Sequence, residues 1–369
     1  MGAFDRVHRE GVDVRTAVTA RTRNSLESSR PHKAPGKIAR SPVGSWMRGL
    51  PATLQKAGAR FPARAKKALR PHLVPLRRFM LAPVEQEMRQ LRSQVEQLGA
   101  SQRVVIPTGD GDVLVRTVVG WVLCGADDTL VLASLIDGGE LERGTRKLIE
   151  RLVKPGDVFV DVGAHLGLLT LAAGNAMQRS GSIHAYEPFR ESARRLRAAV
   201  ELNGMSHLVT VRETALSNRV GTGTLYLGQV SGHHSLYPLP ENQAADASPA
   251  DVQLNSLDID LADVAHADVI KIDAEGAEMA IVQGADGLIQ RSPEVALIVE
   301  LGPSHLSRVG VSLEEWFASF EARGLVFRVI DRETGLLTQR AMSTLREIDS
   351  VNLLFARPDA QAWLRAGKG

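Results

Sequence analysis

Residues 156–167 read Gly-Asp-Val-Phe-Val-Asp-Val-Gly-Ala-His-Leu-Gly, an apolar segment that ends in an acid and a turn with two glycines. Residues 158–160 have the β-branched and aromatic content of a buried parallel strand, and residues 166–177 are typical of an amphipathic helix. Glycine in the turn allows positive φ and lets a ligand approach the backbone. The spacing of Gly163 and Gly167 differs from the Gly-x-Gly-x-x-Gly pattern that binds dinucleotides, so it disfavours a nicotinamide cofactor. The stretch predicts the first strand, turn and helix of a cofactor-binding α/β domain.

A second acid follows the next predicted strand. Residues 182–186 form that strand, and Glu187 comes directly after it, about twenty residues beyond the glycine turn. A carboxylate at this position can accept hydrogen bonds from both hydroxyls of a ribose. Together the turn and Glu187 fit S-adenosyl-L-methionine, with its methionine part against the turn and its ribose on Glu187. An ordinary α/β turn followed by a surface glutamate is the alternative interpretation.

Strands and helices alternate along the rest of the chain, which predicts a doubly wound, Rossmann-like sheet of about seven strands. In such sheets, ligands bind at the carboxyl ends of the strands near the topological switch point. The predicted strands are residues 157–162, 182–186, 208–212, 269–273, 295–301, 326–330 and 351–356, and the predicted helices are residues 166–177, 191–203, 277–283 and 313–323. The acids at or just beyond strand ends are Asp161, Glu187, Glu213, Asp273 and Glu300.

Residues 269–278 place three carboxylates at the end of one predicted strand, in the sequence Val-Ile-Lys-Ile-Asp-Ala-Glu-Gly-Ala-Glu. Asp273 ends the strand, where we expect it to face the cofactor crevice. Glu275 and Glu278 fall in the following turn and the first helical residues, and there they could merely complement the helix dipole. Asp273 is therefore the stronger candidate for contact with the reaction centre.

The order of these segments resembles the FkbM-type methyltransferase family. The resemblance rests on Lys-Pro-Gly-Asp at 154–157, the turn at 160–167, Glu187-Pro188, Ala215-Leu216-Ser217 and the acidic segment at 271–278, and it spans residues 140–305. Many class I methyltransferases share the glycine turn, whereas the segment at 271–278 is more particular to this family. The resemblance implies a class I methyltransferase fold and an S-adenosylmethionine-dependent O-methyltransferase that modifies a hydroxyl of a sugar, glycan or natural product.

The resemblance also implies roles for individual residues. Asp161 and Gly163 would line the methionine side of the cofactor, Glu187 would hold its ribose, and residues 273–278 would border the reaction centre. His165 stands where the family often has Asn, and its imidazole could donate a hydrogen bond near the cofactor or cap the following helix. The residues expected to bind the cofactor are Asp161, Gly163, His165, Gly167, Glu187 and Glu213.

Methyl transfer to a hydroxyl requires an aligned acceptor and a general base within hydrogen-bond reach. Asp273 is the first candidate for this base and Glu275 is the second. Weaker candidates are His233, His234 and His305. The first two histidines belong to residues 228–248, a segment rich in Gly, Ser and Pro that could close over a substrate or leave both rings in solvent.

A metal ion is compatible with the sequence but is not required by it. Asp273, Glu275 and Glu300 could offer oxygen ligands to Mg²⁺. The sequence has no cluster of Cys or His with the spacing of a zinc site.

The single cysteine, Cys124, rules out an internal disulfide and favours a reducing compartment. The sequence contains no run of about 18 apolar residues, so it predicts no membrane-spanning helix. Charged residues interrupt the N-terminal segment, so it does not resemble a secretory signal. We therefore expect a cytoplasmic protein.

Residues 1–78 contain 18 Lys and Arg but only 4 Asp and Glu, whereas the remainder of the chain is net acidic. Their composition predicts a largely disordered tail, or a chain whose true start is Met80. A basic tail could serve an RNA or other nucleic-acid methyltransferase, but it has few aromatic residues to stack on bases. We expect no stable nucleic-acid complex.

Residues 79–100 have a heptad seam from Leu81 to Leu98, which predicts a short helix that either packs on the main domain or forms a homodimer. A non-catalytic scaffold that dimerises through this helix is the second alternative function. Residues 101–139 predict a small β element with strands at 103–106, 113–123 and 129–136, and residues 141–153 predict a helix. Residues 140–360 would then form the methyltransferase domain.

Overall fold

The computed structural model describes residue 87 and residues 103–367. The predicted tail at 1–78 lies outside the described residues. So does the predicted seam from Leu81 to Leu98, apart from Glu87, which is helical and exposed. Homodimer formation through this seam stays a prediction. In the described part of the chain, no helix has the length and apolar character needed to cross a bilayer.

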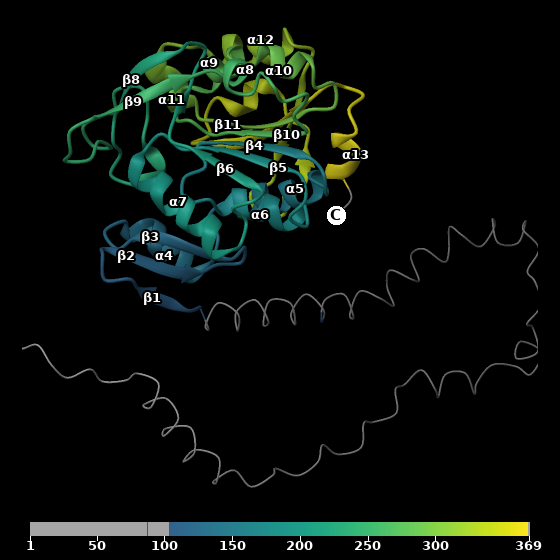
Figure 1. The fold of residues 1–369 in the computed structure, drawn as a ribbon. Coiled ribbons are helices and arrows are strands. Elements are labelled where there is room, and N and C mark those ends of the chain that lie inside the picture. Colours follow the sequence, from purple (N-terminus) through teal and green to yellow (C-terminus); the bar gives the residue numbers. More distant parts are fainter. Residues whose placement is uncertain (1–86, 88–102, 368–369) are drawn as a thin grey trace, which may run out of the picture. The chain divides into compact units, whose positions relative to one another are not determined.

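The centre of the fold is an eight-stranded sheet in the order β13-β12-β14-β11-β10-β4-β5-β6 (Figure 1). Strands β4, β5, β6, β10 and β11 are parallel, and β14 runs antiparallel between β11 and β12. Seven strands match the predicted ones, and the two-residue β13 adds an edge. The bounds are β4 Val158–Val162, β5 Ser182–Tyr186, β6 Val209–Arg212, β10 Val269–Ile272, β11 Ala296–Leu301, β12 Val326–Ile330, β13 Leu337–Thr338 and β14 Val351–Ala356. The predicted doubly wound, Rossmann-like α/β fold is confirmed.

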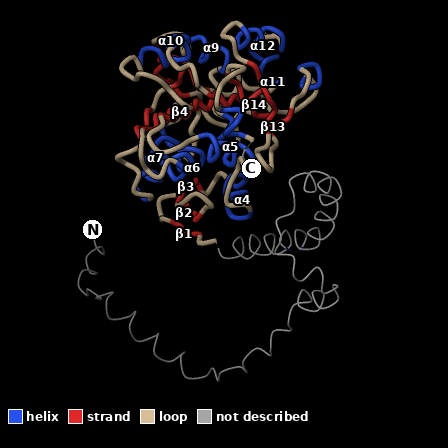
Figure 2. The backbone as a smooth tube through the Cα atoms, turned by 90° about the vertical axis from the view of Figure 1, so that its right-hand side faces the viewer, coloured by secondary structure: helices blue, strands red, loops and turns tan. Residues whose placement is uncertain are grey.

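Helices cover both faces of this sheet (Figures 1 and 2). Side chains alternate along a strand, so Phe159 packs in the core on one face and Val160 in the core on the other. The first core is covered by α5 (Arg143–Leu152), α6 (Leu168–Ala176), α7 (Arg190–Leu202) and α13 (Ala362–Ala366). The second is covered by α8 (Leu257–Asp260), α9 (Glu278–Gln283), α10 (Asp286–Gln290), α11 (Pro303–Val309) and α12 (Leu313–Glu321).

The small N-terminal element differs from its prediction in two places. Its sheet has three antiparallel strands, β1 (Val105–Pro107), β2 (Asp112–Arg116) and β3 (Trp121–Gly125). The predicted strand 113–123 is wrong, because a turn at 117–120 divides it into β2 and β3. The predicted strand 129–136 is also wrong, because these residues form helix α4 (Thr129–Asp137). The Asp128 side chain caps α4 by accepting a hydrogen bond from the Val131 amide at 3.3 Å.

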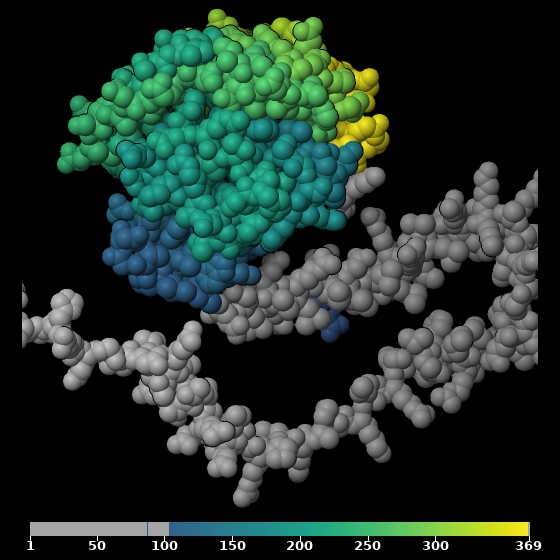
Figure 3. All heavy atoms as spheres, in the orientation of Figure 1, coloured from purple at the N-terminus to yellow at the C-terminus, as the bar shows by residue number. Residues whose placement is uncertain are grey.

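The N-terminal element packs on α7, and Figure 3 shows it as a blue lobe against the teal part of the domain. The Asn203 side chain joins the two by accepting a hydrogen bond from the Trp121 amide at 3.0 Å and donating one to the Trp121 carbonyl at 2.7 Å. Asp112 is buried and forms ion pairs with Arg194 and Arg195 of α7.

A third sheet, which the sequence did not reveal, follows β6. It consists of β7 (Ala215–Leu216), β9 (Ala250–Asn255) and β8 (Gly221–Leu225) in that order. Residues 226–249 connect β8 to β9 and include the short helix η2 (Ser231–His233). A second short helix, η3 (Met342–Leu345), precedes β14.

Candidate functional site

A cavity of about 550 Å³ lies at the carboxyl ends of β4, β5, β10 and β11, within the size range of small-molecule sites. Strand order reverses between β4 and β10, so the cavity sits at the topological switch point. Residues 230–234, from the segment between β8 and β9, form another part of its wall. The lining contains the predicted residues Asp161, Gly163, His165, Glu187, His233, His234, Asp273, Glu275 and Glu300.

The two glycines of the turn have different roles. Both have positive φ, +71° at Gly163 and +89° at Gly167. A Cβ on Gly163 would lie 1.9 Å from the Asp273 carbonyl oxygen, so close approach of two backbones requires glycine there. A Cβ on Gly167 would meet Leu196 of α7 at 2.4 Å, and Gly167 is not part of the cavity wall. Gly167 therefore lets the turn pack closely against α7, and it is the N-cap residue of α6.

Asp161 is fully buried, and only one of its two carboxylate oxygens has a hydrogen bond. Oδ2 accepts from Thr170 Oγ1 at 2.5 Å, while Oδ1 has no hydrogen-bond partner and lies 3.9 Å from Lys271 Nζ. Burial raises the pKa of Asp161, and the Lys271 ammonium opposes this shift. The unpartnered oxygen is a ready acceptor for a cationic or N–H group in the cavity.

Lys271 connects the two halves of the site and was missing from the predicted set. Its Nζ donates to the Gly163 carbonyl at 2.9 Å and lies 3.4 Å from Asp273 Oδ2. Burial alone would lower the pKa of Lys271, but the carboxylates of Asp273 and Asp161 raise it above its ordinary value. A lone lysine inside the buried strand β10 is the sequence signal that could have identified it.

Glu187 lies at the end of β5, is 6% exposed and contacts the glycine turn. Its Oε2 accepts from the His165 amide at 2.8 Å, and its Oε1 accepts from the Phe189 amide at 2.9 Å. Burial raises the pKa of Glu187 to about 7, although both amide hydrogen bonds act in the opposite direction. Each oxygen retains a lone pair that could accept a further hydrogen bond from a ligand.

His165 joins the turn to the wall segment at 230–234. Its φ is +51°, and its Nε2 lies 2.5 Å from Ser231 Oγ, while the Ser231 amide donates to Asp128 Oδ2 at 3.0 Å. Burial lowers the pKa of His165 to about 4, so the ring is neutral near pH 7. The alternative that His165 caps α6 is wrong, because the N-cap position is Gly167 and no side chain bonds there.

His234 is held in an arrangement that argues against a role as general base. Its Nδ1 accepts from the Gly228 amide at 3.0 Å, and its ring packs edge-to-face on Phe189 with centroids 4.5 Å apart. A neutral imidazole that accepts at Nδ1 carries its proton at Nε2. Burial lowers the pKa of His234 to about 4, so this ring offers a hydrogen-bond donor.

Carboxylates gather where β10 and β11 end. Burial alone would raise the pKa of Asp273, but the Lys271 ammonium holds it below its usual range. The pKa of Glu275 is raised to about 8, mainly by burial and to a lesser extent by the charges of Asp273 and Glu278. Burial and Asp273 also raise the pKa of Glu300 well above its ordinary value. This part of the wall therefore combines an ionised carboxylate with two that hold protons more tightly.

Two predicted acids lie outside the cavity wall. Glu213 is exposed and pairs with Arg197 at 3.2 Å. Glu278 is buried, and its Oε1 accepts from the amides of Ala274 and Gly276 at 3.1 and 3.0 Å, so it stabilises the turn after β10. Cavity residues that the sequence did not single out include Glu142, Ser231 and Asn352, which come from segments far from the glycine turn.

Part of the chain matches a family model. Residues 161–328 match the model of the methyltransferase FkbM domain family. No curated protein matched the chain. A solved structure of methyltransferase FkbM from Methylobacillus flagellatus KT is 14% identical, with 63% of this chain and 55% of that chain covered and a TM-score of 0.35. The present chain thus spans about half of that protein.

Two further solved structures are similar to the chain. A precorrin-6y C5,15-methyltransferase from Geobacter metallireducens GS-15 is 15% identical, covers 58% of this chain and 86% of that chain, and has a TM-score of 0.33. A SAM-dependent O-methyltransferase from Thermotoga maritima is 11% identical, covers 66% and 77%, and has a TM-score of 0.35. Residues 161–328, which run from β4 into β12 of the Rossmann-like sheet, therefore form a methyltransferase FkbM domain.

Proposed function

We propose that this methyltransferase modifies a hydroxyl oxygen of a sugar, glycan or natural product. The observation that carries the proposal is the position of Asp273, an acid with a lowered pKa that lines the same cavity as the glycine turn. A carboxylate there can accept the proton of an alcohol acceptor.

The residues at the turn fit S-adenosylmethionine. Asp161 presents a buried, unpartnered oxygen that would accept from the ammonium of the methionine part, and Gly163 would lie beside it. Glu187 would accept from the ribose hydroxyls. When bound, the cofactor supplies a methyl group on a positively charged sulfur. The many carboxylates in the wall favour a cationic ligand of this kind.

Lys271, Asp273, Glu275 and His234 are the side chains that would act on the acceptor. Lys271 keeps Asp273 ionised, so that Asp273 accepts the hydroxyl proton as the acceptor reacts. Glu275 is the second candidate base, with a pKa of about 8 that suits proton transfer near neutral pH. His234 would orient the acceptor by donating from Nε2.

The acidic wall also bears on the nucleic-acid alternative. Acids in the lining are Glu142, Asp161, Glu187, Asp273, Glu275, Glu300 and Glu333, and bases are Arg143, Lys271 and Arg332. Acidic side chains outnumber basic ones in this wall, so a phosphate-rich acceptor would meet few groups that could pair with its charge. The wall therefore favours a neutral acceptor.

The test is methylation of acceptor panels by the full chain. Mass spectrometry with isotopically labelled cofactor should detect methyl ethers on glycosides or natural-product alcohols, while RNA remains unlabelled. Calorimetry on the same preparation should detect cofactor binding, and a folded protein that binds no cofactor would support the scaffold alternative. Label on RNA, or on nitrogen alone, would contradict the proposal.

A further inference from the structure

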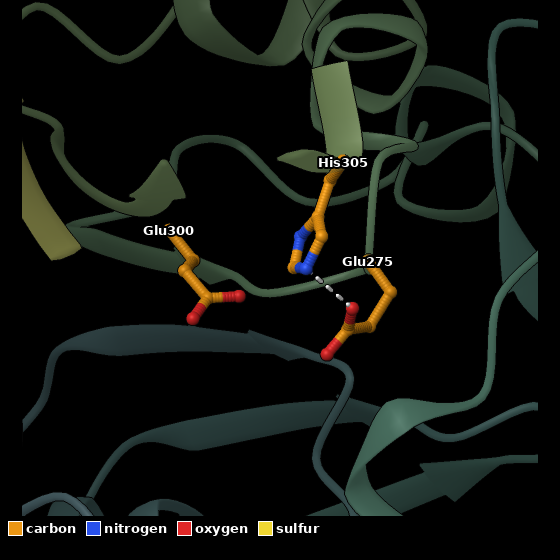
Figure 4. Close-up of side chains that lie close together, drawn as sticks. All are labelled: Glu275, Glu300 and His305. Carbon is orange, nitrogen blue, oxygen red and sulfur yellow. Dashed lines mark ion pairs between the residues drawn. The ribbon is translucent and has the colours of Figure 1, made fainter. Parts of the chain in front are cut away.

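Three potential metal ligands, Glu275, Glu300 and His305, lie close together (Figure 4). Glu275 follows β10, Glu300 lies in β11, and His305 lies in α11. One ligand atom from each residue lies within 4.8 Å of the other two. His305 Nε2 and Glu275 Oε2 are 3.1 Å apart. Ligand bonds of about 2.1 Å place neighbouring donors roughly 3 to 4 Å apart, so small side-chain adjustments would complete a site.

We propose that Glu275, Glu300 and His305 bind a divalent cation of the first transition series at the edge of the cavity. Two carboxylates with one imidazole suit Mn²⁺, Fe²⁺ or Zn²⁺ better than Mg²⁺, because Mg²⁺ prefers oxygen ligands and retains its waters. These ligands differ from the possible Mg²⁺ ligands named from the sequence, because they include His305 and not Asp273.

The backbone holds these ligands in place. The Glu275 carbonyl accepts from Ser235 Oγ at 2.8 Å and from Arg308 Nη2 at 2.6 Å, which fixes the residue at a φ of +52°. Glu300 lies within the ladder between β11 and β14. A Cβ on Gly302 would lie 2.5 Å from His305 Nδ1, so the ring occupies space that any larger residue at 302 would fill. Glycine at 302 therefore leaves room for the imidazole, whose Nε2 lies 3.1 Å from Glu275 Oε2.

Charge at the site also favours a cation. In the part of the chain that the structure describes, no salt bridge joins Glu300 to a basic side chain, and Glu275 pairs only with His305. Lys271 is engaged with Asp273 and the Gly163 carbonyl. A divalent ion would offset the repulsion between the two glutamates.

The position of the metal site indicates a role for the cation in catalysis, and this role rests on the proposed function. Glu275 and Glu300 line the cavity, so the coordination positions that the protein leaves open would face the acceptor. An alcohol bound there would lose its proton to Asp273 more readily, because a cation stabilises the alkoxide.

The test measures Mn²⁺ binding to the full chain after removal of metals with a chelator. Electron paramagnetic resonance of free Mn²⁺ should show one bound ion per chain, displaced by Zn²⁺ but not by an equal concentration of Mg²⁺. Glu300→Gln and His305→Gln should each weaken binding at least about tenfold, as loss of a metal ligand or its support does. His266→Gln, at an exposed histidine paired with Asp268, is the matched control and should bind as the wild type does.

The outcomes separate this inference from the proposed function. No Mn²⁺ binding by wild type, or equal binding by wild type and both variants, would overturn the metal site. Cofactor binding, measured by calorimetry on the same samples, verifies that each variant is folded. If the wild type methylates hydroxyls but binds no Mn²⁺, the metal site is wrong and the proposed function stands. If it binds Mn²⁺ but methylates no hydroxyl, the metal site stands and the proposed function is wrong.

Discussion

Glu187 connects the glycine turn to the proposed ribose site, and its substitution tests that assignment. Glu187→Gln retains one acceptor oxygen in place of two, so it cannot satisfy both backbone amides and a diol. We expect the dissociation constant for S-adenosylmethionine to rise about 10-fold to 100-fold, equivalent to one charge-assisted hydrogen bond. Glu213→Gln, at an exposed acid outside the cavity wall, should leave affinity unchanged. Calorimetry measures both, and an unaffected Glu187→Gln protein would refute the ribose role.

The raised pKa of Glu187 predicts opposite effects of pH on binding and on stability. The folded group binds its proton with a pKa of about 7, above the ordinary 4.5, so the unliganded protein loses stability as pH rises between these values. Cofactor affinity should instead increase over the same range, as the carboxylate forms. Calorimetry from pH 5.5 to 8 checks the affinity, and a wild-type profile as flat as that of Glu187→Gln would contradict this prediction.

Asp273 should affect turnover more than binding. Asp273→Asn removes the proton acceptor but keeps the shape of the side chain. We expect turnover with a hydroxyl acceptor to fall about 10²-fold to 10⁴-fold, the contribution of a general base, while cofactor affinity changes little. Asp286→Asn, at an exposed position on α10, is the control. Equal losses of turnover and affinity would assign Asp273 a structural role.

At the scale of elements, the turn between β4 and α6 shows how far local sequence reasoning extends. From the sequence, glycine at 163 was explained by the approach of a ligand. In the structure, the atom that excludes a side chain there is the carbonyl oxygen of Asp273, directly after the neighbouring strand β10. The seven main strands were predictable because helices cover both sheet faces, which makes each strand an apolar run. The run at 129–136 looked similar, and only the Asp128 cap and the buried pair Val131 and Leu135 distinguish it as a helix.

Gly163 in the turn and Gly156 before β4 provide a matched pair of glycine substitutions. Gly163→Ala combines a φ of +71° with a clash against the Asp273 carbonyl, whereas Gly156→Ala has a φ of +93° and nothing within 4 Å. We expect Gly156→Ala to lower the free energy of unfolding by about 1 kcal/mol and Gly163→Ala by about 3 kcal/mol or more. Urea unfolding monitored by circular dichroism measures both. Equal losses would show that the backbone near Asp273 relaxes to admit a side chain.

At the scale of the whole molecule, the candidate site is assembled from segments that are distant in sequence. The glycine turn and the segment at 269–278 were recognisable because each combines a strand end with acids. Glu142 at the start of α5, the wall at 230–234 and His305 join them only through the tertiary fold. No local periodicity indicates such convergence, so these parts of the site could not be predicted.

The contact between the N-terminal element and α7 carries the last prediction. Asp112 is 3% exposed and accepts from Arg194 and Arg195, with its Oδ1 2.8 Å from Arg195 Nε. Asp112→Asn leaves two guanidinium groups without their carboxylate. Arg195 is largely buried but Arg194 is about half exposed, so the free energy of unfolding should fall by about 2 kcal/mol, less than for a fully buried pair. Glu191→Gln removes only an exposed contact to Arg194 at 3.4 Å and should cost less than about 1 kcal/mol. Urea unfolding of the full chain compares them, and equal effects would mean that the buried ion pairs contribute little to holding the element on α7.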